Sequence, residues 1–300
     1  MKENIFLNKT LELLETKGVN EAYEFMLDKK YEVKTWSAQL YNYLYCLAAL
    51  CGRKEEAMAW LNEVIMIKGY WYRPEVFDDE DLDSLRDDNR FKELKAISDK
   101  RYLNAVEEAE TICTWEKIRG ADLALALHGN QQNIDISIES WNFLKKYGYQ
   151  VEYVQSAFVD SYELFRWEDN GKNQLAGVLD KINWNKYGTR TLGGFSAGCN
   201  EILKTFIVKD FKCERIILQS PWIPVIDNEI DEIMNCLKER ETEVIVICGE
   251  DDKDCIRRAN IFVDKAKVKG LNISEYWVKG LGHDFPDDFE DYLLEVMVRN

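Results

Sequence analysis

The sequence predicts an α/β protein with a mainly parallel sheet, preceded by an all-helical region. From residue 111 onward, six short apolar runs alternate with longer stretches in which apolar residues recur every three or four positions. Strands that alternate with helices imply a parallel sheet with right-handed crossovers. The helical spacing also runs through the first hundred residues, where no such alternation is found. Two domains are therefore expected, at residues 1–110 and 111–300, as suits a chain of 300 residues.

The predicted elements of the α/β region follow one another at regular intervals. Strands are expected at residues 123–127, 150–154, 190–194, 215–219, 243–248 and 273–278, with a further short run at 111–116. Helices are expected at residues 137–147, 172–184, 197–209, 228–239 and 259–268, and an amphipathic run at 289–298 follows. Ligands of such sheets bind at the carboxyl ends of the strands. The residues that follow each strand are therefore the first candidates for a functional site.

A serine stands between two glycines directly after the third of these six strands. The segment is Gly194-Phe195-Ser196-Ala197-Gly198, and a helical stretch follows it. A sharp strand-to-helix turn that carries a nucleophile brings backbone segments close together, and glycine relieves the contact. The pattern predicts that Ser196 is a nucleophile exposed on such a turn. The alternative is a serine that only caps a helix.

Two histidines occur in the chain, and both follow predicted strands. His283 follows the last strand, where a base would reach back over the sheet to the serine; the alternative is a loop histidine that caps a helix. His128 follows the first strand and is expected to be a hydrogen-bonded loop residue. A carboxylate that orients the base is expected after the strand at 243–248. Asp252 is the first choice and Asp251 the alternative, because sequence alone does not separate adjacent loop side chains.

Four motifs make residues 111–300 resemble an α/β-hydrolase of the carboxylesterase, dienelactone hydrolase and peptidase-like type. The motifs are Leu127-His128-Gly129-Asn130, Gly194-Phe195-Ser196-Ala197-Gly198, Gly249-Glu250-Asp251-Asp252 and Gly280-Leu281-Gly282-His283. The order of serine, acid and base along the chain is the order of that family. The resemblance implies Ser196 as nucleophile, His283 as general base and acid, and Asp252 as the orienting acid.

The same resemblance implies an oxyanion hole formed by the backbone N–H groups of Asn130 and Ala197. Attack on a carbonyl concentrates negative charge on one oxygen, and each preorganised donor is worth about 3 to 4 kcal/mol for that charge. These donors complete the site that the resemblance predicts.

Aromatic residues near the predicted site are expected to line a pocket for an apolar or acyl-bearing substrate. They are Phe158, Tyr162, Phe195 and Trp222. The alternative is that they pack their loops onto the domain.

In the helical region, Gly18 and Gly52 are 34 residues apart, and each precedes an acidic, alanine-containing helix start. This spacing resembles the helix–turn–helix period of tetratricopeptide repeats. Helices are expected at residues 5–15, 19–29, 35–50, 54–67 and 92–110. Three roles stay open for this region: docking of a protein or peptide partner, a lid over Ser196, and an architectural support or dimer surface.

Composition narrows the function classes. The net charge is −16, from 39 Lys and Arg against 55 Asp and Glu, which argues against nucleic acid and anionic membranes as partners. No stretch is apolar enough for a membrane span or a signal peptide, so a cytoplasmic protein without membrane insertion is expected. The eight cysteines form no Cys-x-x-Cys pair, which favours reduced thiols over disulfides or a metal site. No phosphate-binding glycine loop is found, so no cofactor is expected.

Together these observations predict a cofactor-independent serine hydrolase that cleaves a carboxylic ester, a thioester or a small amide through an acyl-enzyme. One alternative is an interaction protein, in which the repeats bind a partner and the hydrolase-like domain is a non-catalytic scaffold. Another is a peptidase or acyltransferase that uses the same triad. The sequence leaves the acyl chain length, the leaving group and the oligomeric state open.

Overall fold

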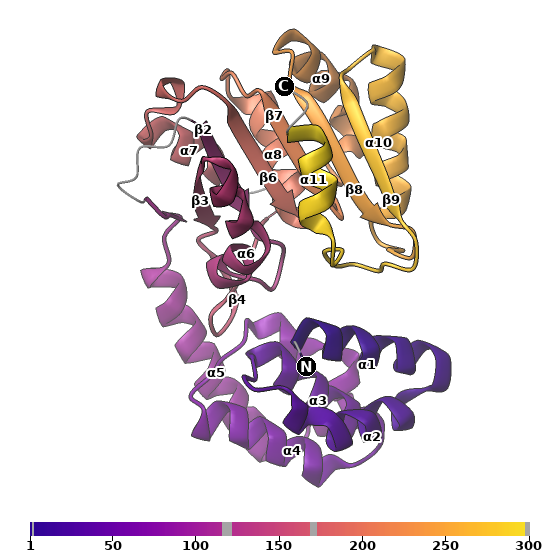
Figure 1. Ribbon diagram of the computed structural model, residues 1–300. Helices are drawn as coiled ribbons and strands as arrows, with labels where there is room; N and C mark the ends of the chain where they lie inside the picture. Colours follow the sequence, from indigo (N-terminus) through magenta and orange to yellow (C-terminus); the bar gives the residue numbers. More distant parts are fainter. Residues whose placement is uncertain (2, 116–121, 169–172, 298–300) are drawn as a thin grey trace. The chain divides into compact units, whose positions relative to one another are not determined.

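The computed structural model describes residues 1, 3–115, 122–168 and 173–297. The chain divides into two compact units, and Figure 1 shows their elements. Unit 1 comprises Met1–Ala109 and Val159–Leu164, and unit 2 comprises Glu110–Phe158 and Phe165–Asn300. The chain therefore passes between the units three times. Residues 116, 172 and 298, which end or begin predicted elements, lie outside the described residues.

Unit 1 consists mainly of helices that pair along the chain. They are α1 (Glu3–Lys17), α2 (Val19–Lys29), α3 (Ala38–Leu50), α4 (Lys54–Asn62) and α5 (Asn89–Glu108). Helix α1 packs on α2, and α3 packs on α4. Gly18 and Gly52 lie between the helices of these two pairs with φ of 97° and 73°, a backbone conformation that glycine adopts without strain. The Ser37 hydroxyl caps α3 by accepting the N–H groups of Gln39 and Leu40.

The segment Val159–Leu164 completes the core of unit 1 although it is distant in sequence from the helices. The Tyr162 ring stacks on the Tyr70 ring with centroids 4.3 Å apart. The Arg73 N–H donates to the Asp160 carbonyl oxygen at 2.9 Å. Leu164 is buried in the same apolar cluster as the side chains of the helices.

Unit 2 is built on a seven-stranded sheet with the order β1-β3-β2-β6-β7-β8-β9. The strands are β1 (Ile112–Cys113), β2 (Asp122–Leu127), β3 (Tyr149–Gln155), β6 (Arg190–Phe195), β7 (Arg215–Gln219), β8 (Glu243–Gly249) and β9 (Ile273–Val278). All neighbours are parallel except β1, which runs antiparallel to β3. All six predicted strands are therefore present, and the run at 111–116 contains β1.

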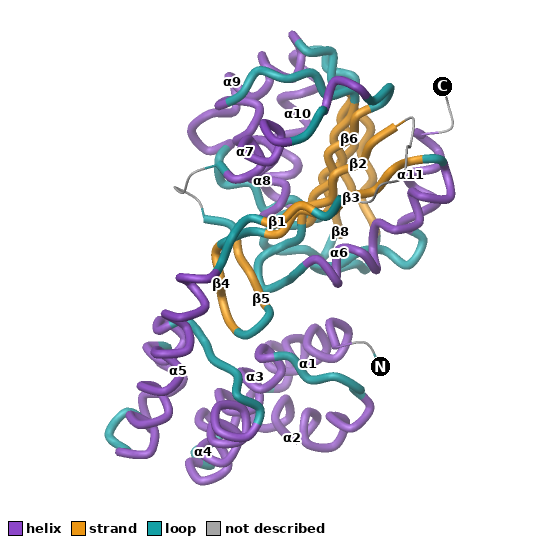
Figure 2. The backbone as a smooth tube through the Cα atoms, turned by 90° about the vertical axis from the view of Figure 1, so that its left-hand side faces the viewer, coloured by secondary structure: helices purple, strands orange, loops and turns teal. Residues whose placement is uncertain are grey.

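Helices cover both faces of this sheet, as Figure 2 shows. On one face lie α6 (Ile134–Trp141) and α11 (Phe289–Met297). On the other lie α7 (Gln174–Lys181), α8 (Ala197–Val208), α9 (Ile226–Glu239) and α10 (Ile256–Lys269). Side chains of β2 alternate between the two faces: Leu125 packs with the four-helix side, and Ala126 packs with Trp141. None of the described helices has the length and apolar character that crossing a membrane requires.

Two local predictions are wrong. A hairpin of β4 (Phe158–Ser161) and β5 (Leu164–Arg166) follows the second predicted strand, where no strand was expected. Its strands are too short to show an alternating pattern in the sequence, and Glu163 turns between them with φ of 59°. The helix expected at 137–147 ends as an α-helix at Trp141 and continues as 3-10 turns to Tyr147.

Candidate active site

Ser196 occupies a sharp turn between β6 and α8. Its φ of 51° and ψ of −119° are uncommon for a residue with a side chain. A Cβ at Gly194 would lie 2.8 Å from the Cys199 nitrogen, and one at Gly198 would lie 2.6 Å from the His128 carbonyl oxygen. Both flanking glycines are therefore required by close backbone contacts, as the sequence pattern predicts.

Three polar side chains meet at the carboxyl ends of β6, β8 and β9. His283 Nε2 lies 2.9 Å from Ser196 Oγ, and His283 Nδ1 lies 2.9 Å from Asp252 Oδ2. In the neutral imidazole that can serve as a base, the serine hydroxyl donates to Nε2 and the Nδ1–H donates to the carboxylate. Asp252 is buried, whereas Asp251 is exposed and its N–H donates to the Leu281 carbonyl oxygen. The structure thus brings Ser196, Asp252 and His283 together and leaves Asp251 outside.

The exposure that the sequence predicts for Ser196 is wrong. Ser196 is only 8% exposed, because the turn is enclosed by the ends of neighbouring strands. Its N–H donates to the Gln219 carbonyl oxygen at 3.0 Å, and its own carbonyl oxygen accepts the Trp222 N–H at 3.3 Å. The His283 side chain is 36% exposed, so solvent reaches the site on the imidazole side.

The loop that carries His283 is held by the ends of β7 and β8. A Cβ at Gly249 would lie 2.0 Å from the Leu281 carbonyl oxygen, so the loop crosses directly over this glycine. Gln219 Nε2 donates to the Asp284 carbonyl oxygen at 2.7 Å, and Ser220 Oγ donates to the same oxygen at 3.3 Å. Sequence reasoning missed Gln219 and Ser220, although polar side chains at the end of a buried apolar strand were the signal available.

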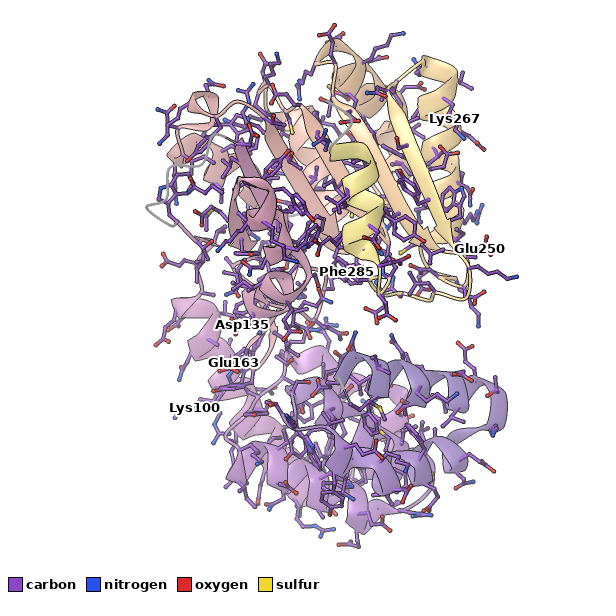
Figure 3. The ribbon with its side chains drawn as sticks, viewed as in Figure 1. Lys100, Asp135, Glu163, Glu250, Lys267 and Phe285 are labelled. Carbon is purple, nitrogen blue, oxygen red and sulfur yellow. The ribbon has the colours of Figure 1, made fainter. Side chains whose placement is uncertain are left out.

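Aromatic rings line the same end of the sheet. The Phe195 ring lies 5.0 Å from the His283 ring and stacks on Phe285 at 4.7 Å. Figure 3 labels Phe285 and Glu250, which both lie at the end of the sheet where the parallel strands finish. The buried Phe195 ring and the partly buried Phe285 ring therefore form an apolar pair beside the imidazole.

The four aromatic residues predicted for a pocket have different neighbours. Phe195 and Trp222 contact the triad residues through the ring and the N–H described above. Phe158 begins β4 and donates its N–H to Ser156 Oγ at 2.9 Å. Tyr162 belongs to unit 1, where its ring stacks on Tyr70.

His128 is buried beneath the loop after β2 and links it to β3. Its Nδ1–H donates to the Gly129 carbonyl oxygen at 2.6 Å, and its Nε2 accepts the Ser156 N–H at 3.1 Å. The ring stacks on Trp167 with centroids 5.0 Å apart. These bonds specify a neutral imidazole, which agrees with the prediction of a hydrogen-bonded loop residue.

The two N–H groups expected for an oxyanion hole lie in adjacent segments. A Cβ at Gly129 would lie 3.1 Å from the Ser196 Cβ, so the loop after β2 runs beside the serine. The Asn130 side chain accepts the Trp167 N–H at 2.8 Å, which holds this loop. Ala197 is the first residue of α8, so its N–H has no acceptor within the helix.

Two buried thiols, absent from the sequence prediction of the site, surround the Asp252 carboxylate. Cys255 N–H donates to Asp252 Oδ1 at 3.1 Å, and Cys255 Sγ lies 3.5 Å from His283 Nδ1. Cys248 Sγ lies 3.9 Å from Asp252 Oδ2. Burial alone would raise the pKa of Asp252, but the hydrogen bond and positive charge of His283, with the bonds from Cys255, hold this pKa below its ordinary value. Burial raises the pKa of Cys248 to about 12, so its thiol is protonated at neutral pH.

Comparisons with known proteins bear on the fold of the chain. Residues 2–106 match the family model described as A/B hydrolase-like, N-terminal domain. The crystal structure of esterase PE8 is 18% identical, covers 63% of this chain and 98% of its own, and has a TM-score of 0.50, which indicates a shared fold. An uncharacterized protein from Bacillus cereus ATCC 10987 is 30% identical across 99% of this chain and 98% of its own, with a TM-score of 0.56. At this identity and coverage, the chain belongs to the same family as that Bacillus cereus protein. The matched family model and the shared esterase fold support an α/β-hydrolase assignment.

The matched family model covers the helices of unit 1, whereas the shared fold with the esterase concerns the α/β part of the chain. The resemblance of this region to tetratricopeptide repeats is not confirmed. Zea mays acyl-protein thioesterase 2 is 14% identical, with 63% of this chain and 98% of that chain covered and a TM-score of 0.45. No protein with a curated description matches the chain.

The α/β-hydrolase unit is expected to lose stability in mild acid through His128. Burial lowers the pKa of His128 to about 4, although the hydrogen bond to the Gly129 carbonyl opposes the shift. The unfolded imidazole has a pKa of about 6.5. Between these pH values the unfolded chain binds more protons than the folded protein does. The free energy of unfolding is therefore unaffected by protonation of His128 above about pH 6.5 and falls as the pH decreases toward 4. The difference is about 3 kcal/mol.

Urea unfolding of the wild type and of a His128→Gln variant at several pH values between 7 and 4 checks this expectation. Carboxylates titrate in both proteins, so the difference between their free energies of unfolding isolates His128. We expect the wild type to lose more stability than the variant across this range. Equal losses in the two proteins would show that His128 is not responsible.

Proposed function

We propose that unit 2 is a cofactor-independent serine hydrolase that cleaves a carboxylic ester, a thioester or a small amide through an acyl-enzyme. The observation that carries the proposal is the succession of two 2.9 Å hydrogen bonds from Ser196 through His283 to Asp252. The positive φ of Ser196, at the N-terminus of α8, supports it further. Strain of this kind is concentrated at functional sites.

Each residue has a separate role in the proposed reaction. Ser196 Oγ attacks the carbonyl carbon while its proton passes to Nε2 of His283. Asp252 keeps the other imidazole nitrogen protonated and stabilises the imidazolium that forms. The N–H groups of Asn130 and Ala197 donate to the oxygen on which negative charge develops. His283 then protonates the leaving group, and water releases the acyl group by the same route.

The apolar part of the substrate is proposed to lie against Phe195 and Trp222. The support for Phe195 is the contact of its ring with the His283 ring, and the support for Trp222 is the backbone hydrogen bond that holds this residue beside Ser196. The partly buried Phe285 ring stacks on Phe195 and is proposed to contact the same part of the substrate. Phe158 and Tyr162 stay predictions for this role, as do the preferences among ester, thioester and amide.

Unit 1 has a separate proposed role, the docking of a protein or peptide partner in the cytoplasm. The support is the tetratricopeptide-like spacing of Gly18 and Gly52, together with the two helix pairs that these glycines join. A lid over Ser196 and a dimer surface are the alternatives to docking.

Labelling with a fluorophosphonate probe tests the proposed hydrolase. The probe reacts covalently with a serine that is activated by a base. We expect the native protein to be labelled on the peptide that contains Ser196, as located by mass spectrometry. The His283→Ala variant should react far more slowly, and heat-denatured protein should stay unlabelled.

A natively folded protein that takes no label would favour the non-catalytic scaffold. If the label attaches, a panel of acyl esters, thioesters and peptides then separates an esterase from a peptidase or an acyltransferase that uses the same triad.

A further inference from the structure

Three side chains with metal-binding atoms converge beside the proposed triad. The carboxylate of Asp252, the thiol of Cys255 and the imidazole of His283 place one ligand atom each within 4.8 Å of one another. Cys255 Sγ and His283 Nδ1 are 3.5 Å apart, and Nδ1 and Asp252 Oδ2 are 2.9 Å apart. A tetrahedral zinc ion with bonds of about 2.0 to 2.3 Å requires ligand atoms about 3.3 to 3.7 Å apart. The thiol and the imidazole already have this spacing, whereas the carboxylate has to move away from Nδ1 to admit the ion.

We propose that Asp252, Cys255 and His283 bind a zinc ion, with water in the fourth position, and that this ion switches the hydrolase off. We call these three residues the Asp–Cys–His triangle. The sequence predicted no metal site, because His283 lies 28 residues after Cys255 and so escapes any local ligand motif.

The donor set selects the kind of metal. A thiolate and an imidazole favour zinc or cobalt, whereas magnesium and calcium prefer oxygen ligands. Two ligands of the Asp–Cys–His triangle are anions in the bound state, the carboxylate of Asp252 and the thiolate of Cys255, so their charges offset that of the buried divalent cation. Asp252 and Cys255 are buried, and the partly exposed His283 leaves a route for the ion from solvent.

Metal binding in the Asp–Cys–His triangle would change the protonation of the imidazole without any redox step. The Cys255 thiol loses its proton to solvent as the metal–sulfur bond forms. The metal takes the lone pair at His283 Nδ1, and the proton that was there moves to Nε2. Nε2 then faces Ser196 as an N–H donor and accepts no proton from the hydroxyl. Inhibition rests on the function proposed above, but binding of the metal does not.

Cobalt titration of the purified, chelator-treated protein tests the binding. A cobalt ion in the Asp–Cys–His triangle should give the absorption bands of tetrahedral cobalt and a thiolate-to-cobalt charge-transfer band, saturating at one equivalent. The Cys255→Ala variant should lose the charge-transfer band. The matched control is Cys248→Ala, which removes the neighbouring buried thiol outside the triangle and should keep the band.

The site is rejected if the wild type gives no thiolate band, or if the band survives in Cys255→Ala with its circular dichroism spectrum intact. Binding at another cysteine would produce that second result.

Hydrolysis of an acyl ester with added zinc tests the inhibition. Each variant's rate is divided by its own rate in chelator, so that differences in basal activity cancel. The zinc concentration for half-inhibition should rise about tenfold or more in Cys255→Ala. Losing a residue that only hydrogen-bonds to a zinc ligand already lowers metal affinity by about 10- to 100-fold, and Cys255 is itself a ligand in the proposed site. Magnesium at the same concentrations should not inhibit.

The two proposals fail in different ways. If the protein gives the cobalt band but neither hydrolyses esters nor reacts with the fluorophosphonate, the metal site is supported and the proposed hydrolase is rejected. If the protein is active and labelled but gives no cobalt band, the hydrolase is supported and the metal site is rejected. Equal zinc sensitivity of wild type and Cys255→Ala would also reject the triangle.

Discussion

Replacing Ser196 by alanine is expected to lower kcat/KM for a short p-nitrophenyl acyl ester by about 10⁴-fold or more. The change removes the oxygen that lies 2.9 Å from His283 Nε2, so no acyl-enzyme forms. Alanine meets the same backbone constraint at φ of 51° as serine does, and the melting temperature should therefore change by only a few degrees. Steady-state hydrolysis and thermal unfolding of the purified variant measure the two effects.

Ser140→Ala provides the matched control. Ser140 is a partly buried serine of α6 whose hydroxyl donates to the Ile136 carbonyl oxygen of its own helix, at 3.3 Å. This variant should hydrolyse the ester within about twofold of the wild-type rate, as expected for a change outside the reacting groups. Retained hydrolysis in Ser196→Ala would remove the proposed nucleophile.

Replacing Asp252 by asparagine is expected to lower kcat by about 10⁴-fold. The amide has nearly the shape of the carboxylate but presents an NH₂ group to His283 Nδ1. The amide NH₂ group favours the imidazole tautomer that carries its proton on Nε2. Nε2 faces Ser196 and then has no lone pair with which to accept the serine proton. The buried bond from Cys255 N–H to Oδ1 shows how firmly this side chain is held, so a change of tautomer is expected without a change of position.

The same substitution at Asp251 is the control for Asp252→Asn, since the two residues are adjacent and only Asp252 contacts the imidazole. Asp251→Asn should leave ester hydrolysis within about twofold of wild type, the ordinary range for an exposed position. A large loss in Asp251→Asn together with an active Asp252→Asn would reverse the assignment of the acid.

The parallel sheet was predictable from the alternation of strands and helices. The meeting of three polar side chains at one edge of it was predictable because each of them follows an apolar strand. Ser196 comes directly after such a run and Asp252 and His283 follow theirs within five residues, and parallel strands bring their carboxyl ends to one edge. The choice between Asp251 and Asp252 was not predictable. It depends on a loop in which the N–H of one residue donates to the Leu281 carbonyl while the side chain of the next turns inward.

Features that depend on packing between distant segments were also beyond the sequence. Ser196 is buried because its turn is enclosed by segments that include Gln219 and Trp222, which lie more than twenty residues further along the chain and hydrogen-bond to its backbone. Cys255 reaches the imidazole only because its α10 begins beside the end of β8. The hairpin β4–β5 has strands of four and three residues, too short for periodicity to reveal.

The segment Val159–Leu164 has a consequence for how the protein is made. During translation, the helices of unit 1 leave the ribosome before this segment is synthesised, and at about 5 to 20 residues per second the delay lasts roughly 3 to 10 seconds. Until then Tyr70 lacks its stacked partner Tyr162, and the helical core lacks Leu164. The nascent helices are therefore exposed to chaperones and proteases for that interval. A fragment ending at residue 109 would stay permanently in the same unfinished state.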